Sequence, residues 1–182
     1  MIHNKTLKNF YFIDDFNKDH IRSLNKNISI IYRNYKEKYD CNKIFEIKRF
    51  CKNIKKKFFL ANDIILANKL NLDGAYIPAF NNCLSVYKLK NKNMILLGSA
   101  HNLKEVNQKK RQGIDIIFLS PTFKVNKSKN FLNIIKFNIL SNLLNGKTVA
   151  LGGINKKNIK KIKMLNCYGF ASISYIKGLN KI

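Results

Sequence analysis

Several side chains that can bind anions or cations stand directly after short apolar runs. Arg33 follows the run Ile28–Tyr32, and the pair Asn62-Asp63 follows Phe58–Ala61. An arginine suits a phosphate or pyrophosphate group, and a carboxylate such as Asp63 suits Mg²⁺, which prefers oxygen ligands. Each residue has a plain structural alternative. Asp63 could cap a helix that begins at Ile64, and Arg33 could be a surface arginine.

Gly152 and Gly153 form the most specific chemical signal in the chain. They follow the apolar run Thr148–Leu151 and precede Asn155, which can cap a helix. Two glycines in such a turn allow backbone N–H groups to approach an anion. Ser174, which follows a last expected strand, would join them as a phosphate ligand. The alternative interpretation is a tight turn without a ligand.

Two lysines and a histidine complete the candidates. Lys127 and Lys129 lie in an expected loop, where a lysine could close on a phosphate or lie in solvent. His101 stands beside the capping residue Asn102, and we interpret it as a hydrogen-bonded structural residue rather than a base. The sequence contains no Ser/His/Asp elbow, P-loop or paired-carboxylate motif.

The elements that must position these residues are eight short apolar runs, which recur about every 20 residues and are predicted to be strands. They are Phe10–Ile13, Ile28–Tyr32, Phe58–Ala61, Ala75–Ile77, Met94–Leu97, Ile114–Leu119, Thr148–Leu151 and Gly169–Ile173. Strands that alternate with helices predict an α/β fold, a compact (β/α)₈ TIM barrel. We expect one domain over residues 1–182, with a short or missing last helix. An open doubly wound sheet is the rival architecture and would need fewer strands.

Three helices between the strands have clear sequence signals. Asn102 and Glu105 form an expected capping box, in a helix that Gly113 would end. Asn155 can cap a helix that carries Ile159, Ile162 and Leu165. A third helix is expected to end at Gly146 and to have one apolar face, made of Phe131, Ile135, Ile139, Leu140 and Leu143.

The charge balance limits the class of partner. Lys and Arg total 35 and Asp and Glu total 10, which gives a formal net charge of +25. The lysines are spread along the chain and few arginines are present, so we interpret the basic surface, including Lys55-Lys56-Lys57, as solvated. Nucleic acid is therefore not the expected partner. A basic protein would still attract anionic small molecules.

Other classes of protein are disfavoured by what the sequence lacks. No apolar run approaches the roughly 18 residues of a membrane span, and no secretory signal is recognisable. The four cysteines lie far apart, and none forms a Cys-x-x-Cys pair. We expect a cytoplasmic protein whose partners are small phosphates or pyrophosphates and not a membrane. Whether it forms a homo-oligomer is left open.

The second half of the chain resembles the thiamine phosphate synthase/TenI family. The resemblance rests on Gly98-Ser99-Ala100-His101, Gly113-Ile114-Asp115, Ser120-Pro121-Thr122-Phe123, Ala150-Leu151-Gly152-Gly153-Ile154-Asn155 and Gly169-Phe170-Ala171. It implies a (β/α)₈ barrel that couples an aminopyrimidine pyrophosphate to a thiazole phosphate in thiamine biosynthesis. In this reaction pyrophosphate leaves with the help of Mg²⁺, and the thiazole nitrogen captures the pyrimidine cation.

The resemblance also implies roles for individual residues. Arg33 and Asn62 would contact the pyrophosphate or pyrimidine, and Asp63 would bind Mg²⁺. Lys129 would neutralise pyrophosphate, if one inserted residue is allowed in its loop. Gly152, Gly153 and Ser174 would hold the thiazole phosphate.

The chain departs from the family pattern at three places. The family's Gln-x-Arg-x-Lys strand end is Ile31-Tyr32-Arg33-Asn34-Tyr35 here, and the segment Ile77–Asn81 lacks the family's second Mg²⁺-binding aspartate. Pro121 stands where the thiazole tautomerase branch has a histidine. These departures keep an alternative open, a TenI-like protein that processes a thiazole, or binds a thiazole or thiamine phosphate, without synthase activity.

Overall fold

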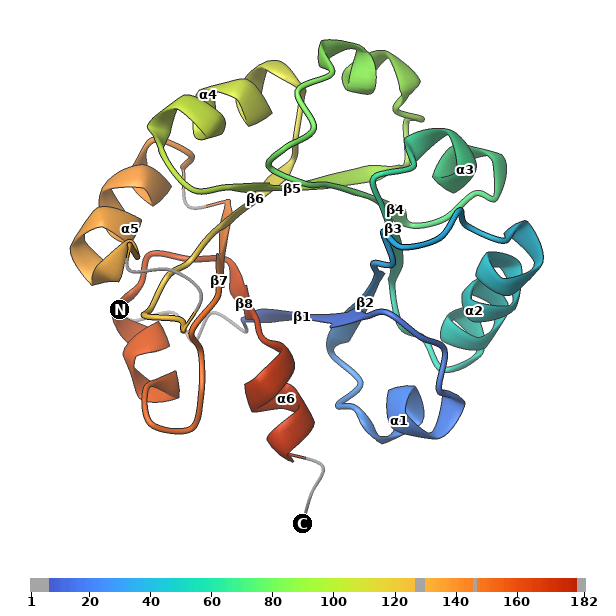
Figure 1. The fold of residues 1–182 in the computed structure, drawn as a ribbon, viewed down its shortest axis with the longest axis horizontal. Coiled ribbons are helices and arrows are strands. Elements are labelled where there is room, and N and C mark those ends of the chain that lie inside the picture. The colour runs from blue at the N-terminus through green and yellow to red at the C-terminus, as the bar shows by residue number, and fades with distance from the viewer. Residues whose placement is uncertain (1–6, 127–129, 146, 180–182) are drawn as a thin grey trace.

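The chain folds as a closed barrel of eight parallel strands in the computed structural model, which describes residues 7–126, 130–145 and 147–179 (Figure 1). Each strand pairs with its neighbours in chain order, and β8 closes the barrel against β1. The strands are β1 (Lys8–Ile13), β2 (Ile28–Tyr32), β3 (Phe58–Ala61), β4 (Gly74–Ile77), β5 (Ile95–Ala100), β6 (Ile116–Leu119), β7 (Thr148–Leu151) and β8 (Gly169–Ala171). The predicted (β/α)₈ barrel is confirmed.

The outer layer contains six α-helices and two 3₁₀ segments within the described residues. The helices are α1 (Lys18–Ser23), α2 (Cys41–Asn53), α3 (Ile64–Lys69), α4 (Leu103–Arg111), α5 (Asn133–Asn142) and α6 (Ile173–Leu179). The 3₁₀ segments are η1 (Leu84–Leu89), after β4, and η2 (Ile159–Met164), after β7. The last helix is short, as predicted. None of the described helices is long and apolar enough to cross a membrane.

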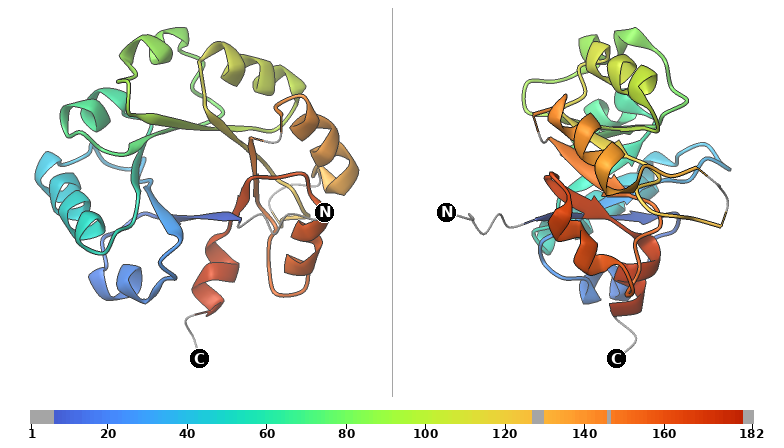
Figure 2. Two further views of the ribbon diagram at one scale, coloured as in Figure 1. Left: turned by 180° about the vertical axis from the view of Figure 1, so that it is seen from behind. Right: turned by 90° about the vertical axis from the view of Figure 1, so that its left-hand side faces the viewer.

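Side chains alternate between the two faces of the barrel wall, as strand geometry requires. One buried cluster fills the inside of the barrel and includes Phe10, Phe12, Phe59, Tyr76 and Phe118. The other, larger cluster lies between the strands and the helices. Figure 2 shows the barrel from the side: β1 begins at one end, and the loops after β2 and β6 project at the other. The strand ends that carry Arg33 and Asn62-Asp63 therefore share one end of the barrel.

The strand prediction for the last run was too long, and this moves Ser174. Strand β8 ends at Ala171, and Ser174 lies exposed in the first turn of α6. The buried Ser172 causes the change, because its hydroxyl accepts from the backbone N–H of Tyr175 at 3.1 Å. This is the contact of a helix N-cap.

The helix predicted to begin at Asn155 does not form. Turns occupy residues 156–158, and η2 follows. The side chains of Asn155 and Asn158 satisfy the local backbone instead: the oxygen of Asn155 accepts from Lys157 N at 2.9 Å, and that of Asn158 accepts from Asn155 N at 2.9 Å. Such local side-chain bonds compete with an α-helix.

The apolar face predicted for α5 was right only at Leu140, and it left out Phe137. Ile135, Ile139 and Leu143 are 71%, 58% and 52% exposed, whereas Phe137 and Leu140 are buried. This helix is apolar on both sides, so spacing alone does not choose the inner face. Ser141 marks that face, since its buried hydroxyl lies 2.6 Å from that of Thr148 in β7.

Candidate functional site

Arg33 lies at the mouth of the barrel, directly after β2. Its backbone N–H donates to the carbonyl of Ile13 at 2.8 Å, which carries the β1–β2 pairing one residue further. Its guanidinium carbon lies 4.5 Å from the centroid of the Phe12 ring, which points into the barrel. A guanidinium over an aromatic face is held in orientation while its N–H groups remain able to bind an anion.

The floor beneath Arg33 is aromatic and buried. Phe12 packs edge-to-face against Tyr76, with ring centroids 5.2 Å apart, and Tyr76 packs in the same way on Phe118 at 5.5 Å. Burial raises the pKa of Tyr76, whose hydroxyl is hydrogen-bonded to Ser99 of β5. Ser99 is therefore part of the floor, and a charged group above it would interact strongly with Arg33 because the buried rings beneath form a medium of low dielectric constant.

Asn62 and Asp63 occupy the turn between β3 and α3. Asn62 has a positive φ of 59°, a conformation that asparagine tolerates better than most residues, and its N–H donates to Tyr76 O at 2.7 Å. Its side-chain oxygen accepts from Asn81 Nδ2 at 2.7 Å, so the Nδ2 donors of Asn62 remain for a ligand. Asp63 Oδ1 accepts from Leu66 N at 2.8 Å, which confirms the helix-capping alternative for this residue.

Asp63 can hold Mg²⁺ only as one ligand among several. Among the residues that the structure describes, no three His, Cys, Asp or Glu side chains come together as a metal site. The capping bond uses Oδ1 and leaves Oδ2 for a cation. Proteins commonly bind Mg²⁺ through one or two carboxylates, with substrate phosphates and water supplying the other ligands. Asp63 therefore fits a Mg²⁺ ion that arrives with a pyrophosphate.

An aromatic pair, Tyr35 and Phe80, lies in the two segments where the chain departs from the family pattern: Tyr35 stands where the resemblance implies a lysine, and Phe80 lies within Ile77–Asn81, which lacks the second aspartate. Tyr35 comes from the loop after β2 and Phe80 from the loop after β4, and their rings meet edge-to-face at 5.6 Å. Burial raises the pKa of Tyr35, although part of the ring is exposed. Burial also raises the pKa of nearby Tyr39 to about 12, and its hydroxyl donates to Ala61 O at 2.8 Å. One wall of the mouth is therefore aromatic, and it includes the position where the resemblance implies a lysine.

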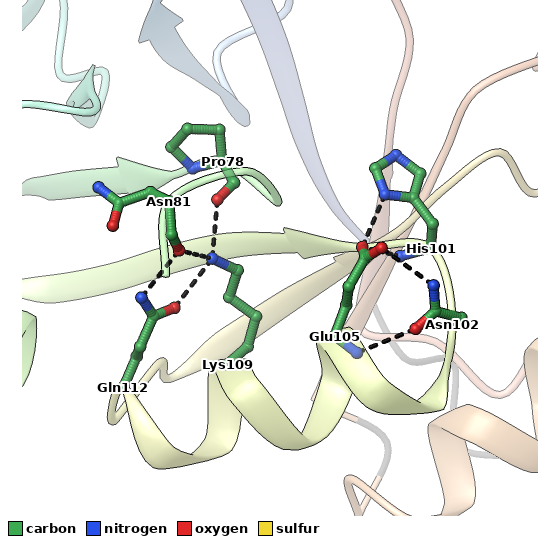
Figure 3. A network of polar contacts seen from close by, with 7 residues as sticks. All are labelled: Pro78, Asn81, His101, Asn102, Glu105, Lys109 and Gln112. Atoms are coloured by element: carbon green, nitrogen blue, oxygen red, sulfur yellow. Dashed lines mark hydrogen bonds and ion pairs between the residues drawn. The ribbon is translucent and has the colours of Figure 1, made fainter. Parts of the chain in front are cut away.

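A buried lysine on α4 holds the loop that carries Phe80 (Figure 3). The ammonium of Lys109 donates to Pro78 O at 2.7 Å, to Asn81 O at 2.9 Å and to Gln112 Oε1 at 2.8 Å. Gln112 in turn donates to Asn81 O and to Cys83 O, both at 2.9 Å. Burial lowers the pKa of Lys109 to about 8. These bonds fix the loop from which Asn81 reaches Asn62.

Sequence reasoning missed Lys109 and Gln112. The helical spacing does indicate that Lys109 is buried. It follows the buried Val106 by three residues and so lies on the inner face of α4. A lysine at such a position must find buried acceptors.

The first turn of α4 is the predicted capping box, also drawn in Figure 3. Asn102 Oδ1 accepts from Glu105 N at 3.0 Å, and Glu105 Oε2 accepts from the N–H of His101 at 2.8 Å and lies 2.7 Å from its Nδ1. Partial burial alone would raise the pKa of Glu105. The hydrogen bonds to His101 and Asn102 outweigh that effect, and the pKa lies below its ordinary value. His101 is hydrogen-bonded within a helix cap, as interpreted from the sequence.

The Gly152-Gly153 turn packs against the loop after β6. The two glycines have φ values of +86° and +74°. A Cβ atom on Gly153 would lie 2.4 Å from the carbonyl oxygen of Phe123. Close packing between loops therefore requires glycine here, with or without an anion.

The same turn is tied to the start of α6. The hydroxyl of Ser172 donates to Ile154 O at 3.0 Å, so the loop after β7 and the turn that carries Ser174 are neighbours. Gly152 and Gly153 therefore lie in a turn that adjoins the helix start carrying Ser174. Lys127 and Lys129 lie outside the described residues.

A cleft of about 530 Å³ opens beside Arg33, along β1 and toward α6. Its lining includes Phe12, Asp14, Asp15, His20 and Lys177. His20 Nε2 lies 3.0 Å from the hydroxyl of Tyr11, and partial burial lowers the pKa of this histidine. Sequence reasoning missed His20, because nothing in the spacing shows that α1 turns it toward β1.

The amino-acid sequence is similar to those of known thiamine-phosphate synthases. The family model described as thiamine monophosphate synthase (TMP-TENI) matches residues 23–176. A thiamine-phosphate synthase of Prochlorococcus marinus subsp. pastoris is 30% identical over 183 residues, covering 94% of this chain and 51% of the relative. A thiamine-phosphate synthase of Pelagibacter ubique is 30% identical over 159 residues, covering 82% of this chain and 74% of the relative.

The chain is shorter than several of these relatives. It spans about half the length of the Prochlorococcus protein and 62% of a thiamine-phosphate synthase of Methanococcus vannielii. The solved structure of a thiamine phosphate pyrophosphorylase from Pyrococcus furiosus has the same fold, with a TM-score of 0.76 at 19% identity over 93% of this chain and 86% of that one. Since the family model covers most of the chain, this protein belongs to the thiamine monophosphate synthase (TMP-TENI) family.

Proposed function

We propose that this barrel is a thiamine phosphate synthase-like transferase, which joins an aminopyrimidine pyrophosphate to a thiazole phosphate and releases pyrophosphate. The observation that carries the proposal is the placement of Arg33 and Asn62-Asp63 at the same end of adjacent strands, beside an aromatic floor and an open cleft. Membership of the family supports the same reaction.

Arg33 and Asn62 act on the pyrophosphate in this proposal. The guanidinium, held over Phe12, donates to phosphate oxygens and stabilises the charge that develops as the C–O bond to the pyrimidine breaks. Asn62, fixed by Asn81, offers its Nδ2 donors to the same group or to the pyrimidine. Asp63 Oδ2 would hold Mg²⁺, which supplies further positive charge to the leaving group.

The thiazole phosphate takes the opposite side of the mouth. Backbone N–H groups at Gly152-Gly153 and the hydroxyl of Ser174 would donate to it, since these loops adjoin through the bond from Ser172 to Ile154. Lys129 keeps its proposed role toward pyrophosphate. We further propose that the protein acts in the cytoplasm on small phosphates and pyrophosphates, as a single chain or as a homo-oligomer.

The test is a coupling assay on the purified protein with both substrates, with and without Mg²⁺. We expect Mg²⁺-dependent thiamine phosphate. Asp63→Asn should abolish that product while leaving the fold intact, because asparagine caps a helix as well as aspartate does. Arg33→Ala should lower the rate by at least about tenfold, in keeping with the loss of one charged hydrogen-bond donor. Full activity in both variants would reject the assignment.

The aromatic pair Tyr35–Phe80 favours a second candidate, the TenI-like role. Tyr35 stands where the resemblance implies a lysine, and its ring meets Phe80 of the segment that lacks the second Mg²⁺-binding aspartate. In this case the protein would bind thiazole phosphate or thiamine phosphate and would yield no coupled product. Calorimetric binding of thiazole phosphate, measured beside the coupling assay, separates the two roles.

A further inference from the structure

The end of the barrel where the strands begin, opposite Arg33, carries two clefts lined by lysines. One, of about 250 Å³, lies at the barrel opening and is lined by Lys8, Lys26, Lys55 and Lys57. The other, of about 580 Å³, runs toward α2 and is lined by Lys48, Lys52, Lys55, Lys56 and Lys57. Lys55 and Lys57 line both clefts, which therefore adjoin. We call this surface the amino-end cleft.

A buried lysine holds the amino-end cleft together. Lys56 is only 6% exposed, and its ammonium donates to Leu24 O at 3.0 Å and to Asn25 O at 2.6 Å. The interpretation of Lys55-Lys56-Lys57 as a solvated run was wrong for Lys56, because its side chain turns inward onto the loop before β2. That bond ties the loop carrying Lys55 and Lys57 to the loop carrying Lys26, so the fold keeps these like charges near one another.

Few carboxylates balance these lysines. Over the described part of the chain, no ion pair joins the lysines of the amino-end cleft to an acid. Asp73 is the one acid among the lining residues, and its Oδ2 accepts from the N–H of Phe58 at 2.9 Å. Lys52 has a structural reason to stand at the end of α2, where the helix dipole favours a cation. No such reason covers Lys8, Lys26 or Lys57.

The floor of the smaller cleft is apolar. Phe10, Phe59, Leu97 and Tyr168 form it, under a rim of ammonium groups. Positive charge gathered along two adjoining clefts matches several phosphates in a row better than one isolated phosphate.

We propose that the amino-end cleft is a binding site for a small polyphosphate anion, separate from the site at the mouth. The shared chemistry is a run of linked phosphates, from an inorganic chain or from a nucleoside triphosphate. The apolar floor would add affinity only for the second source.

The experiment is calorimetric titration of the full chain with tripolyphosphate and, separately, with ATP. Lys55→Ala/Lys57→Ala should raise the dissociation constant at this site at least about tenfold, by loss of two charged donors. The matched control is Lys160→Ala/Lys161→Ala, which removes the same charge from two exposed lysines of η2 and should change binding less than about twofold. Arg33→Ala, which weakens the mouth, should leave the amino-end site intact.

Amide NMR shifts locate the bound anion. Shifts at Ser29 and Lys57 with tripolyphosphate would support the proposal, and tighter binding of ATP than of tripolyphosphate would identify the nucleotide as the source. Equal affinities would identify the phosphate chain alone. The proposal is overturned if both double variants weaken binding equally, if Arg33→Ala abolishes all binding, or if the Lys55/Lys57 variant loses thermal stability but keeps its affinity.

Discussion

Replacing Gly153 by alanine should destabilise the protein whether or not the turn binds phosphate. The residue has φ +74°, and the added Cβ would stand 2.4 Å from Phe123 O and 2.6 Å from its carbonyl carbon. The left-handed conformation costs an L-residue about 1–2 kcal/mol, and an overpacked contact that moves backbone costs about 1–3 kcal/mol. Together they predict a loss of about 2–5 kcal/mol, a large share of the roughly 5–15 kcal/mol of a typical domain.

Two other glycines provide a graded control. The Cβ atom added by Gly152→Ala would lie 3.0 Å from Pro121, at a φ of +86°. The loss of stability should therefore be smaller, at about 1–3 kcal/mol. Gly178→Ala, in α6, has only the Lys156 Cε atom within reach, at 3.8 Å. It should be neutral or stabilise by up to about 1 kcal/mol.

Urea unfolding followed by circular dichroism measures all three variants without ligand. A Gly153→Ala protein within about 0.5 kcal/mol of the parent would refute the argument from close packing. If the expected order holds, loss of phosphate binding in a Gly153 variant says nothing about an anion. Ser174→Ala, in an exposed first turn, is then the cleaner test of the phosphate site.

Three further predictions concern the stability of the barrel and the metal affinity of its mouth. The pKa of Lys109 is about 8 in the folded protein against an ordinary 10.5, so the unfolded chain holds more protons between these two pH values. The free energy of unfolding should therefore rise with pH in that range, by at most about 3 kcal/mol. Lys109→Met should flatten that rise in parallel urea titrations, and equal slopes for the two proteins would contradict the assignment. In α5, Phe137→Ala should cost about 3–5 kcal/mol, whereas Ile135→Gln should change stability by less than about 0.5 kcal/mol; the reverse order in urea unfolding would restore the face predicted from spacing. Without pyrophosphate the protein should bind Mg²⁺ only weakly, since Asp63 offers one oxygen; calorimetry that found tight binding to the protein alone would mean that further ligands were missed.

The barrel could be predicted because its signals are local. Eight apolar runs with turns between them identify strands, and alternation with helices leaves few topologies. The Asn102–Glu105 cap was predictable for the same reason, since all its atoms lie within one turn. The residues at strand ends then followed from the rule that chemistry lies at the carboxyl end of a barrel.

What could not be predicted depends on contacts between distant segments. Lys56 and Lys109 bind carbonyls about 30 residues away, so the local sequence does not identify their partners. The inner face of α5 is chosen by Thr148 on the next strand, and the meeting of Tyr35 with Phe80 depends on two loops that flank β3. A strand or helix prediction cannot contain these pairings.

The loop after β4 is held almost entirely by its main chain. Side chains of α4 and of Gln112, its C-cap, bind the carbonyl oxygens of Pro78, Asn81, Asn82 and Cys83, and every amino acid has such an oxygen. The identity of the side chain at position 80 can therefore drift without displacing the loop. In evolutionary terms the anchor separates the shape of the mouth from its chemistry, so a change of side chain at position 80 retunes what the mouth accepts while the barrel stays as it is.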